Sequence, residues 1–271
     1  MFPSIYINDV FSIPLYTPVF LVGFFIAVLI ARRLGPSYGI LKEDVVYASL
    51  YGAIGLLIGA KLFFFLTKLP TIITHFSVYI ELMKLSPLDA LGYAFGGLVF
   101  YGGLFGSILG TYCYCRQFKV DFMPYLNVFA PLLPFIHGFG RIGCFLAGCC
   151  YGIEYHGFCK IQFPYNELVS ELSEVPRFPV QLLEASLNFL VCLILLYLLK
   201  KKNMKQGQLM GIYLLYYAVA RYLLEFLRGD QIRGTVGIFS TSQFISILLL
   251  PIAVLLIRGK WRSHREKAEN I

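Results

Sequence analysis

Charged residues are scarce in this chain. Only 14% of its 271 residues are Asp, Glu, Lys or Arg, whereas a soluble protein averages about 25%. Hydrophobic residues reach 58%, which is more than a soluble domain of this length buries. This composition excludes an ordinary cytosolic enzyme, a disordered chain and a disulfide-rich secreted module, and it predicts an integral membrane protein. The net charge of +8 is then explained by basic cytoplasmic loops, so no nucleic-acid partner is expected.

Basic residues are absent from the first 16 positions, and no small-residue cleavage site follows the first apolar run. No cleavable signal peptide is therefore expected. Seven apolar stretches are long enough to span a bilayer, and they cover residues 15–31, 45–66, 91–114, 123–138, 180–199, 209–227 and 240–257. We predict an all-α integral membrane protein whose single transmembrane domain, residues 1–271, is a seven-helix bundle. Pro131 and Pro134 interrupt the fourth stretch, so we expect that helix to be buried among the others.

Basic residues concentrate in alternate connections and in the C-terminal tail. These segments hold 14 of the 23 Lys and Arg, namely Arg32, Arg33, Lys42, Arg116, Lys119, Lys200, Lys201, Lys202, Lys205, Arg258, Lys260, Arg262, Arg265 and Lys267. The positive-inside rule places the N-terminus outside and the C-terminus in the cytoplasm. Of the outward segments, residues 67–90 can form an amphipathic helix on the membrane surface, and residues 143–179 are predicted to form a small extracytoplasmic cap.

A glycine-rich run, GGLVFYGGLFG, occupies residues 96–106. Its small residues are typical of close packing between membrane helices. Packing does not explain Tyr101, which stands between the glycine pairs. The backbone at Gly102 and Gly103 is therefore also a candidate for contact with a lipid head group.

The segment HGFGRIG at residues 137–143 is predicted to place His137 and Arg141 at the outer end of the fourth helix. An arginine at a helix end can simply extend toward the head groups. Here Gly140 and Gly143 flank it, which indicates a tight backbone site where the forked guanidinium of Arg141 binds an anion.

Further charges fall inside predicted spans, where charge is costly and usually functional. Arg221, Glu225 and Arg228 have the i, i+4, i+7 spacing of one helix face. An ion pair between the first two leaves Arg228 available for an anion. Lys61 is another intramembrane cation, and Glu184 requires a partner. Together these residues predict a polar region in the outer half of the bundle that suits a phospholipid head group.

Four cysteines are predicted to face outward: Cys144, Cys149, Cys150 and Cys159. Inert packing, a disulfide and a functional thiol are alternatives that the sequence leaves open. Zinc is disfavoured because no C-x-x-C pair is present. With no nucleotide motif either, neither a metal site nor a cofactor is predicted.

Six segments together carry a family resemblance. They are Tyr16 followed by LVGFFIA at residues 21–27, GAKLFFF at 59–65, GGLVFYGGLFG at 96–106, HGFGRIG at 137–143, RFPVQLLE at 177–184 and RYLLEFLRGD at 221–230. In this order, along nearly the whole chain, they resemble the prolipoprotein diacylglyceryl transferases of the bacterial inner membrane. The resemblance implies a multi-pass enzyme that uses phosphatidylglycerol from the membrane lipid. It moves the diacylglyceryl group to the lipobox cysteine thiol of a prolipoprotein signal sequence, forms a thioether and releases glycerol phosphate.

The resemblance also implies roles for individual residues. Arg141 matches a phosphate-binding arginine, Arg221 a second essential arginine, and Tyr16 a functional tyrosine of the first span. Glu225 and Arg228 match a further family segment. The acceptor thiol must lose its proton to become a nucleophile, and Tyr101, His137 and Glu225 are the candidate proton acceptors.

The chain departs from the family pattern at several positions. Tyr101 stands where histidine is common, and Lys61 stands where arginine is usual. Cys144 and Cys149 replace an asparagine and a glutamate. These departures leave open a divergent paralogue with another thiol acceptor. A lipid transporter or a redox sensor of the same fold is a further alternative.

Overall fold

The computed structural model describes residues 4–8, 11–164, 171–201, 204–205, 207–229, 235–236 and 239–258. The chain is built almost entirely of helices, with two short pairs of antiparallel strands. Its internal contacts divide it into two compact units. The first unit joins Met1–Leu34 to Leu126–Ile271, and the second is Gly35–Tyr125.

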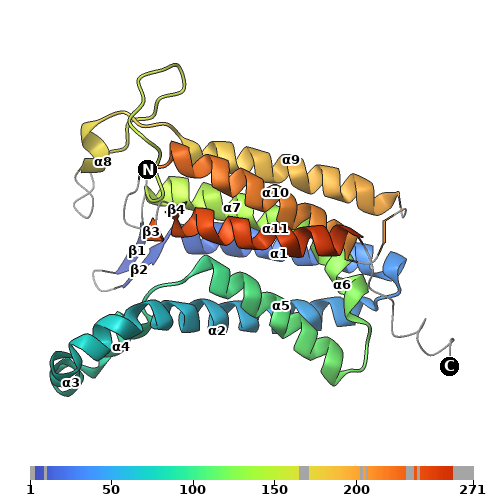
Figure 1. Cartoon of the computed structure of the whole chain (residues 1–271), viewed down its shortest axis with the longest axis horizontal. Coiled ribbons are helices and arrows are strands. Elements are labelled where there is room, and N and C mark those ends of the chain that lie inside the picture. The colour runs from blue at the N-terminus through green and yellow to red at the C-terminus, as the bar shows by residue number, and fades with distance from the viewer. Residues whose placement is uncertain are drawn as a thin grey trace. The chain divides into compact units, whose positions relative to one another are not determined.

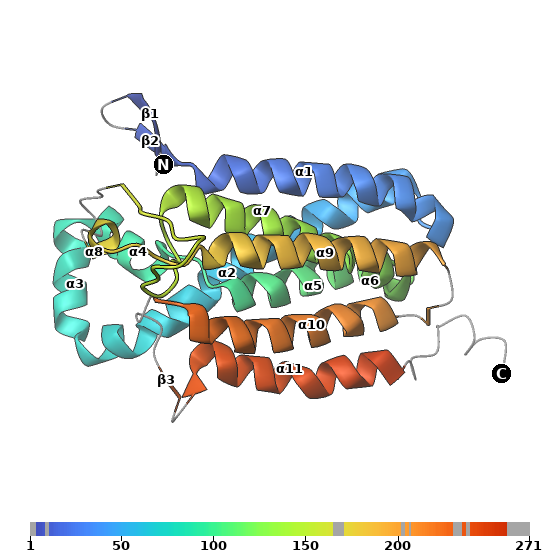
Figure 2. The same ribbon diagram turned by 90° about the horizontal axis from the view of Figure 1, so that it is seen from above.

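Long helices running side by side form the first unit (Figures 1 and 2). They are α1 (Tyr16–Leu34), α7 (Leu132–Ala147), α9 (Val180–Lys200), α10 (Gln208–Leu224) and α11 (Thr241–Arg258). Helix α7 packs against both α1 and α9, and α10 packs against α9 and α11. The strand pairs β1 (Ser4–Asn8) with β2 (Phe11–Pro14) and β3 (Thr235–Val236) with β4 (Phe239–Ser240) precede α1 and α11.

The second unit is a helical hairpin with an appended helix pair. It contains η1 (Gly35–Tyr38), α2 (Lys42–Thr74), α3 (Phe76–Leu85), α4 (Pro87–Phe95) and α5 (Phe100–Gln117). Helices α2 and α5 cross at glycines. A Cβ atom at Gly102 would lie 2.6 Å from Phe63 Cβ, and one at Gly103 would lie 3.3 Å from Leu56 Cγ. The glycine run therefore allows two helices to approach closely, as small residues do in membrane proteins.

The outer surface of the helices is apolar, whereas polar side chains lie inside. Phe25, Ile58 and Leu193 are more than 60% exposed. Buried polar residues are Thr111, Asn127, Gln181, Glu184, Asn188, Arg221, Ser242, Gln243 and Ser246. This arrangement is the one expected for a protein surrounded by lipid, and it confirms the predicted all-α membrane protein.

Among the residues that the structure describes, four helical segments are long and apolar enough to cross a membrane: Tyr16–Tyr38, Lys42–Thr74, Val180–Lys200 and Gln208–Leu227. Two bent helix pairs raise the number to six if each pair counts as one span. These are α4 with α5, bent by 82°, and α6 (Phe122–Phe129) with α7, bent by 43°. The seventh predicted stretch is also helical, and its apolar part, Ser242–Arg258, is shorter than the spans above.

Three predicted boundaries are wrong. The second stretch does not end at residue 66, because α2 continues to Thr74, and residues 67–90 are divided among α2, α3 and α4. The third stretch is not one helix from residue 91, because the chain breaks between α4 and α5. The fourth does not end at residue 138, because α7 continues to Ala147. Pro131 precedes α7 and Pro134 lies in its first turn, where a missing N–H leaves no intrahelical bond unmade. His137 and Arg141 therefore lie within a helix, and the cap begins after that helix ends.

The cap is a loop that pairs with the end of the α10 segment. Ile153 N–H donates to Leu227 O at 3.1 Å, and Gly229 N–H donates to Tyr151 O at 3.1 Å. The backbone of Arg177 forms isolated antiparallel β-bridges with those of Glu154 and Ile161. A short helix, α8 (Glu171–Glu174), follows residues 165–170, which lie outside the described part of the chain. These backbone bonds fix the cap against the ends of α7, α9 and α10.

Candidate functional site

Glu184 lies at the centre of the polar interior of the first unit. It belongs to the second turn of α9, and its side chain is 4% exposed. Its Oε1 atom is 3.0 Å from Arg141 Nε and 3.3 Å from His137 Nε2. His137 and Arg141 are four residues apart in α7, so both side chains project from one helix face. The sequence indicates that Glu184 needs a partner, and His137 and Arg141 are its partners in the structure.

His137 and Arg141 also contact each other. Arg141 Nε–H donates to His137 Nε2 at 3.2 Å. His137 Nε2 therefore lies within reach of both Arg141 Nε and Glu184 Oε1. The ring centroid of His137 is 5.8 Å from that of Tyr217 on α10. The histidine is thus held between α7, α9 and α10.

Arg221 occupies the last turn of α10 and is 3% exposed. Its Nη2 atom donates to Ser242 Oγ at 2.8 Å and lies 2.7 Å from Glu225 Oε2. The predicted pairing of Arg221 with Glu225 is present. Arg221 Nη1 is buried and has no hydrogen-bond partner among the described residues. A buried charged donor without a partner is costly, so this atom is suited to meet an anionic ligand.

Arg228 does not continue the helix face of Arg221 and Glu225. Helix α10 ends at Leu224 and gives way to a 3-10 turn, η2 (Glu225–Leu227), after which Arg228 is extended. The reason is that the chain here pairs with the cap through Gly152. Both Arg221 and Arg228 still interact electrostatically with Glu184.

Tyr16 is the first residue of α1, and it packs over the glycines of α7. A Cβ atom at Gly143 would lie 3.0 Å from Tyr16 Cδ2, and one at Gly140 would lie 3.7 Å from the Tyr16 hydroxyl. Gly143 therefore admits the tyrosine ring. The ring also lies within electrostatic range of Arg141. Close approach of Tyr16, rather than bare backbone alone, explains the spacing of these glycines.

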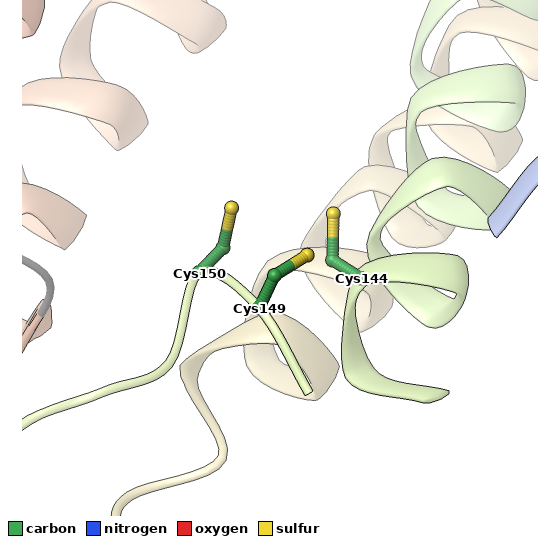
Figure 3. Close-up of side chains that lie close together, drawn as sticks. All are labelled: Cys144, Cys149 and Cys150. Atoms are coloured by element: carbon green, nitrogen blue, oxygen red, sulfur yellow. The ribbon is translucent and has the colours of Figure 1, made fainter. Parts of the chain in front are cut away.

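Three of the outward cysteines meet where α7 ends. The thiols of Cys144, Cys149 and Cys150 lie within 4.8 Å of one another (Figure 3). Hydrogen bonds from the thiols of Cys144 and Cys149 lower the pKa of Cys150. Hydrogen bonds with the same neighbours raise the pKa of Cys149. Cys159 is exposed and does not belong to this group of thiols.

The remaining predicted site residues belong to the second unit. Lys61 on α2 donates to Phe95 O, the last carbonyl of α4, at 2.5 Å. Gly102 and Gly103 are buried between α2 and α5. Tyr101 packs edge-to-face on Phe100, with ring centroids 5.7 Å apart. These contacts account for the residues structurally, and their part in binding or catalysis stays a prediction.

The first unit thus collects Tyr16, His137, Gly140, Arg141, Gly143, Arg221, Glu225 and Arg228 around Glu184. Ser242 was missed, because a serine at the start of a helix resembles an ordinary cap. The guanidinium groups of Arg141, Arg221 and Arg228 outnumber the carboxylates of Glu184 and Glu225. The site therefore has net positive charge within an apolar helix bundle, which favours an anionic and partly apolar ligand.

Comparison with known proteins agrees with this chemistry. A profile of the prolipoprotein diacylglyceryl transferase family matches residues 4–258. Phosphatidylglycerol–prolipoprotein diacylglyceryl transferase 2 of Clostridium perfringens strain 13 is 32% identical over 269 residues, 98% of this chain and 99% of the relative. The Clostridium tetani transferase is 31% identical, covering 89% of this chain and 90% of the relative. The Proteus mirabilis transferase is 29% identical, covering 95% and 90%. The chain is a member of the prolipoprotein diacylglyceryl transferase family.

Proposed function

We propose that this protein transfers the diacylglyceryl group of phosphatidylglycerol to the lipobox cysteine of a prolipoprotein. The acceptor thiol loses its proton and its sulfur attacks the glycerol carbon that carries the phosphate. A carbon–sulfur bond forms, the carbon–oxygen bond to phosphate breaks, and glycerol phosphate leaves with the electron pair. The names of the relatives support this reaction and its two substrates.

The observation that carries the proposal is the buried Nη1 of Arg221, which has no hydrogen-bond partner among the described residues. A second arginine, Arg141, interacts with the same carboxylate, Glu184. Arg141 is oriented by Glu184 at 3.0 Å, and Arg221 by Ser242 at 2.8 Å. Preorganised guanidiniums can bind the phosphate and stabilise charge on the departing glycerol phosphate without rearranging. Arginine suits this role because its fork binds two phosphate oxygens at once.

An apolar groove of about 560 Å³ follows α10 toward this site. Leu187 of α9 and Ile212, Val219 and Leu223 of α10 line it, and it ends at Leu227 beyond Glu225. The groove therefore begins among lipid-facing side chains and ends in the turn that holds the Arg221 ion pair. An acyl chain fits such a groove while its head group reaches the arginines, which supports a phospholipid donor.

His137 and Glu225 are the proton acceptors proposed in this unit. His137 Nε2 contacts both Arg141 and Glu184, and its side chain is only 8% exposed. Glu225 is 13% exposed and lies in the turn after α10. A phosphate that binds Arg221 competes for the guanidinium and frees the Glu225 carboxylate to accept a proton. We therefore favour Glu225, with His137 and Tyr101 as the alternatives.

The proposed setting is the bacterial inner membrane, with the N-terminus and the cap outside and the C-terminus in the cytoplasm. This orientation rests on the distribution of Lys and Arg. It places the acceptor thiol and the arginines on the side where a prolipoprotein signal sequence is exposed.

The test is transfer from labelled phosphatidylglycerol to a lipobox peptide by the purified protein. Thioether-linked diacylglycerol is expected with the native chain and with Arg116→Ala, since Arg116 is exposed in the second unit. Arg141→Ala and Arg221→Ala should each lower the rate on the order of a hundredfold or more. The corresponding Lys variants should recover little, because lysine lacks the fork.

The alternatives give different results in the same assay. A lipid transporter moves phosphatidylglycerol between leaflets without forming a thioether, and a redox sensor leaves both substrates unchanged. A divergent paralogue releases glycerol phosphate only when another thiol is supplied. Native rates in either Ala variant would refute the role of the arginines.

A further inference from the structure

The thiols of Cys144, Cys149 and Cys150 form a group to which the proposed transfer mechanism assigns no role. Cys144 lies in the last turn of α7, and the other two follow Gly148 in the loop. Figure 3 shows the Cys149 side chain directed toward that of Cys144, with Cys150 on the other side of Cys149. All three cysteines are reduced, and Cys149 hydrogen-bonds to both neighbours.

The backbone at the end of α7 creates this arrangement. Gly148 has φ of +71°, Gly148 N–H donates to Phe145 O at 3.2 Å, and Cys149 N–H donates to Cys144 O at 3.0 Å. These are the two bonds of a Schellman motif, which folds the second residue after the helix back onto its last turn. In most such motifs the two residues that meet are apolar. Here they are the thiols of Cys144 and Cys149.

The third thiol, that of Cys150, belongs to a residue whose backbone conformation is rare for residues other than glycine. Cys150 has φ of +57°, a conformation that costs a non-glycine residue on the order of 1 kcal/mol or more. The surrounding chain maintains it, because Gln181 Nε2 donates to Cys149 O at 2.8 Å and Tyr151 O accepts from Gly229 N–H. Hydrogen bonds therefore fix the backbone immediately before and after Cys150.

Packing and disulfide formation each explain only part of this cluster. Cys149 is exposed and Cys150 is half-buried, so the group is not a set of core thiols. A disulfide uses two sulfurs and leaves the third. Neighbouring residues such as Cys149 and Cys150 also have Cα atoms about 3.8 Å apart, closer than the usual range for a disulfide.

We propose that Cys144, Cys149 and Cys150 together bind one thiophilic metal ion, zinc(II) or copper(I), through three thiolates. The donor set is entirely sulfur, which selects soft or borderline metals over magnesium or calcium. Zinc–sulfur bonds of about 2.3 Å require sulfurs roughly 3.8 Å apart, so small rotations of thiols already within 4.8 Å suffice. Each thiol releases its proton to solvent as its sulfur binds the metal.

Local charge favours such a site. Arg141 and Arg228 both lie within electrostatic range of Cys150. Three thiolates with zinc(II) carry a net charge of −1, and with copper(I) a net charge of −2. The two guanidiniums offset this charge. Three protein ligands leave zinc one open position, which water can fill.

The first experiment measures metal bound to the purified full-length protein. The protein is reduced, exposed separately to Zn²⁺, copper(I) or Mg²⁺, desalted, and analysed for metal per chain. About one equivalent of zinc or copper and no retained Mg²⁺ is expected. Cys150→Ser, which changes a loop residue, and Cys149→Ser should each lose the metal. Cys159→Ser and Cys113→Ser, at exposed cysteines outside the cluster, should keep it.

The second experiment follows thiol alkylation by mass spectrometry. Bound metal should slow labelling of Cys149 and Cys150 at least tenfold and leave Cys159 unchanged. Labelling at equal rates with and without metal overturns the proposal, and so does a disulfide from Cys144 found in protein isolated without reductant. Neither experiment measures transfer activity, so the proposal stands or fails independently of the proposed function.

Discussion

Replacing Glu184 with Gln removes a buried carboxylate while keeping the shape of the side chain. The carboxylate is 4% exposed, and it contacts Arg141 at 3.0 Å and His137 at 3.3 Å. Removing one partner of a buried ion pair costs about 3–5 kcal/mol, because the other charge stays buried. Arg141 keeps 12% exposure, so the lower end, about 3 kcal/mol, is expected in the free energy of unfolding.

The same substitution should also reduce transfer. Glu184 touches Arg141 and not the proposed substrate, so it acts as a positioning residue. If most of the 3 kcal/mol is lost from orientation of Arg141, kcat/KM falls on the order of a hundredfold. A double-mutant cycle with Arg141→Gln isolates the pair, and a coupling energy of about 1–3 kcal/mol is expected.

Glu154→Gln is the matched control. Glu154 Oε1 lies 2.9 Å from His156 Nε2, but both side chains are more than half exposed. An exposed pair contributes about 0–1 kcal/mol. Denaturation in mixed micelles measures both variants under the same conditions. Equal stability losses in the two variants, or a Glu184→Gln protein with native transfer rate, would show that Glu184 does not organise the site.

Three further predictions test other parts of the protein. Ser242→Ala removes an acceptor from buried Arg221 and should cost about 1.5–3 kcal/mol in unfolding free energy. Ser186→Ala should be nearly neutral, because the exposed Ser186 hydroxyl donates to Leu182 O within the same helix. Equal losses of stability in the two variants would contradict the importance of the Arg221 contact. Gly102→Val should destabilise by about 1–3 kcal/mol, because its side chain meets Phe63 at the crossing of α2 and α5. Gly92→Ala, whose methyl group enters open space within α4, should not lower the unfolding temperature, because alanine favours a helix over glycine. A reporter active only outside the cytoplasm should work after Asn166 and fail after Asn203, two positions outside the described residues; the reverse pattern refutes the orientation.

Hydropathy predicted where the helices lie better than where they end. The fourth predicted stretch ends at residue 138, within a segment that contains Gly138, Gly140 and Gly143. In the structure these glycines face neighbouring helices, and Cβ atoms at Gly138 and Gly143 would meet Phe189 and Tyr16. A helix tolerates glycine where another helix approaches this closely. That packing depends on residues distant in the chain, so the local pattern does not contain it.

At the site too, contacts within one helix were predictable from the sequence, whereas contacts between helices were not. The pair Arg221–Glu225 follows from four-residue spacing and was predictable. The contact of Glu184 with Arg141 joins α9 to α7, so the sequence indicated only that a partner was needed. Arg228 left the predicted face because Leu227 and Gly229 pair with the cap. Spacing predicts contacts within one helix, whereas contacts between helices require the fold.

Gly148→Ala separates the thiol cluster from the arginine site, although Cys144 and Arg141 both belong to α7. Gly148 has φ of +71° and ends the helix, so alanine should cost on the order of 1 kcal/mol there. Loosening this turn moves Cys149 and Cys150 away from Cys144, and retained metal should fall at least tenfold while alkylation of Cys144 accelerates. Arg141 lies about two turns before Gly148 and is anchored by Glu184, so transfer should change less than threefold. Gly148→Asn should restore metal binding, because asparagine tolerates this conformation. Unchanged metal binding in Gly148→Ala would mean that the helix end does not assemble the three thiols.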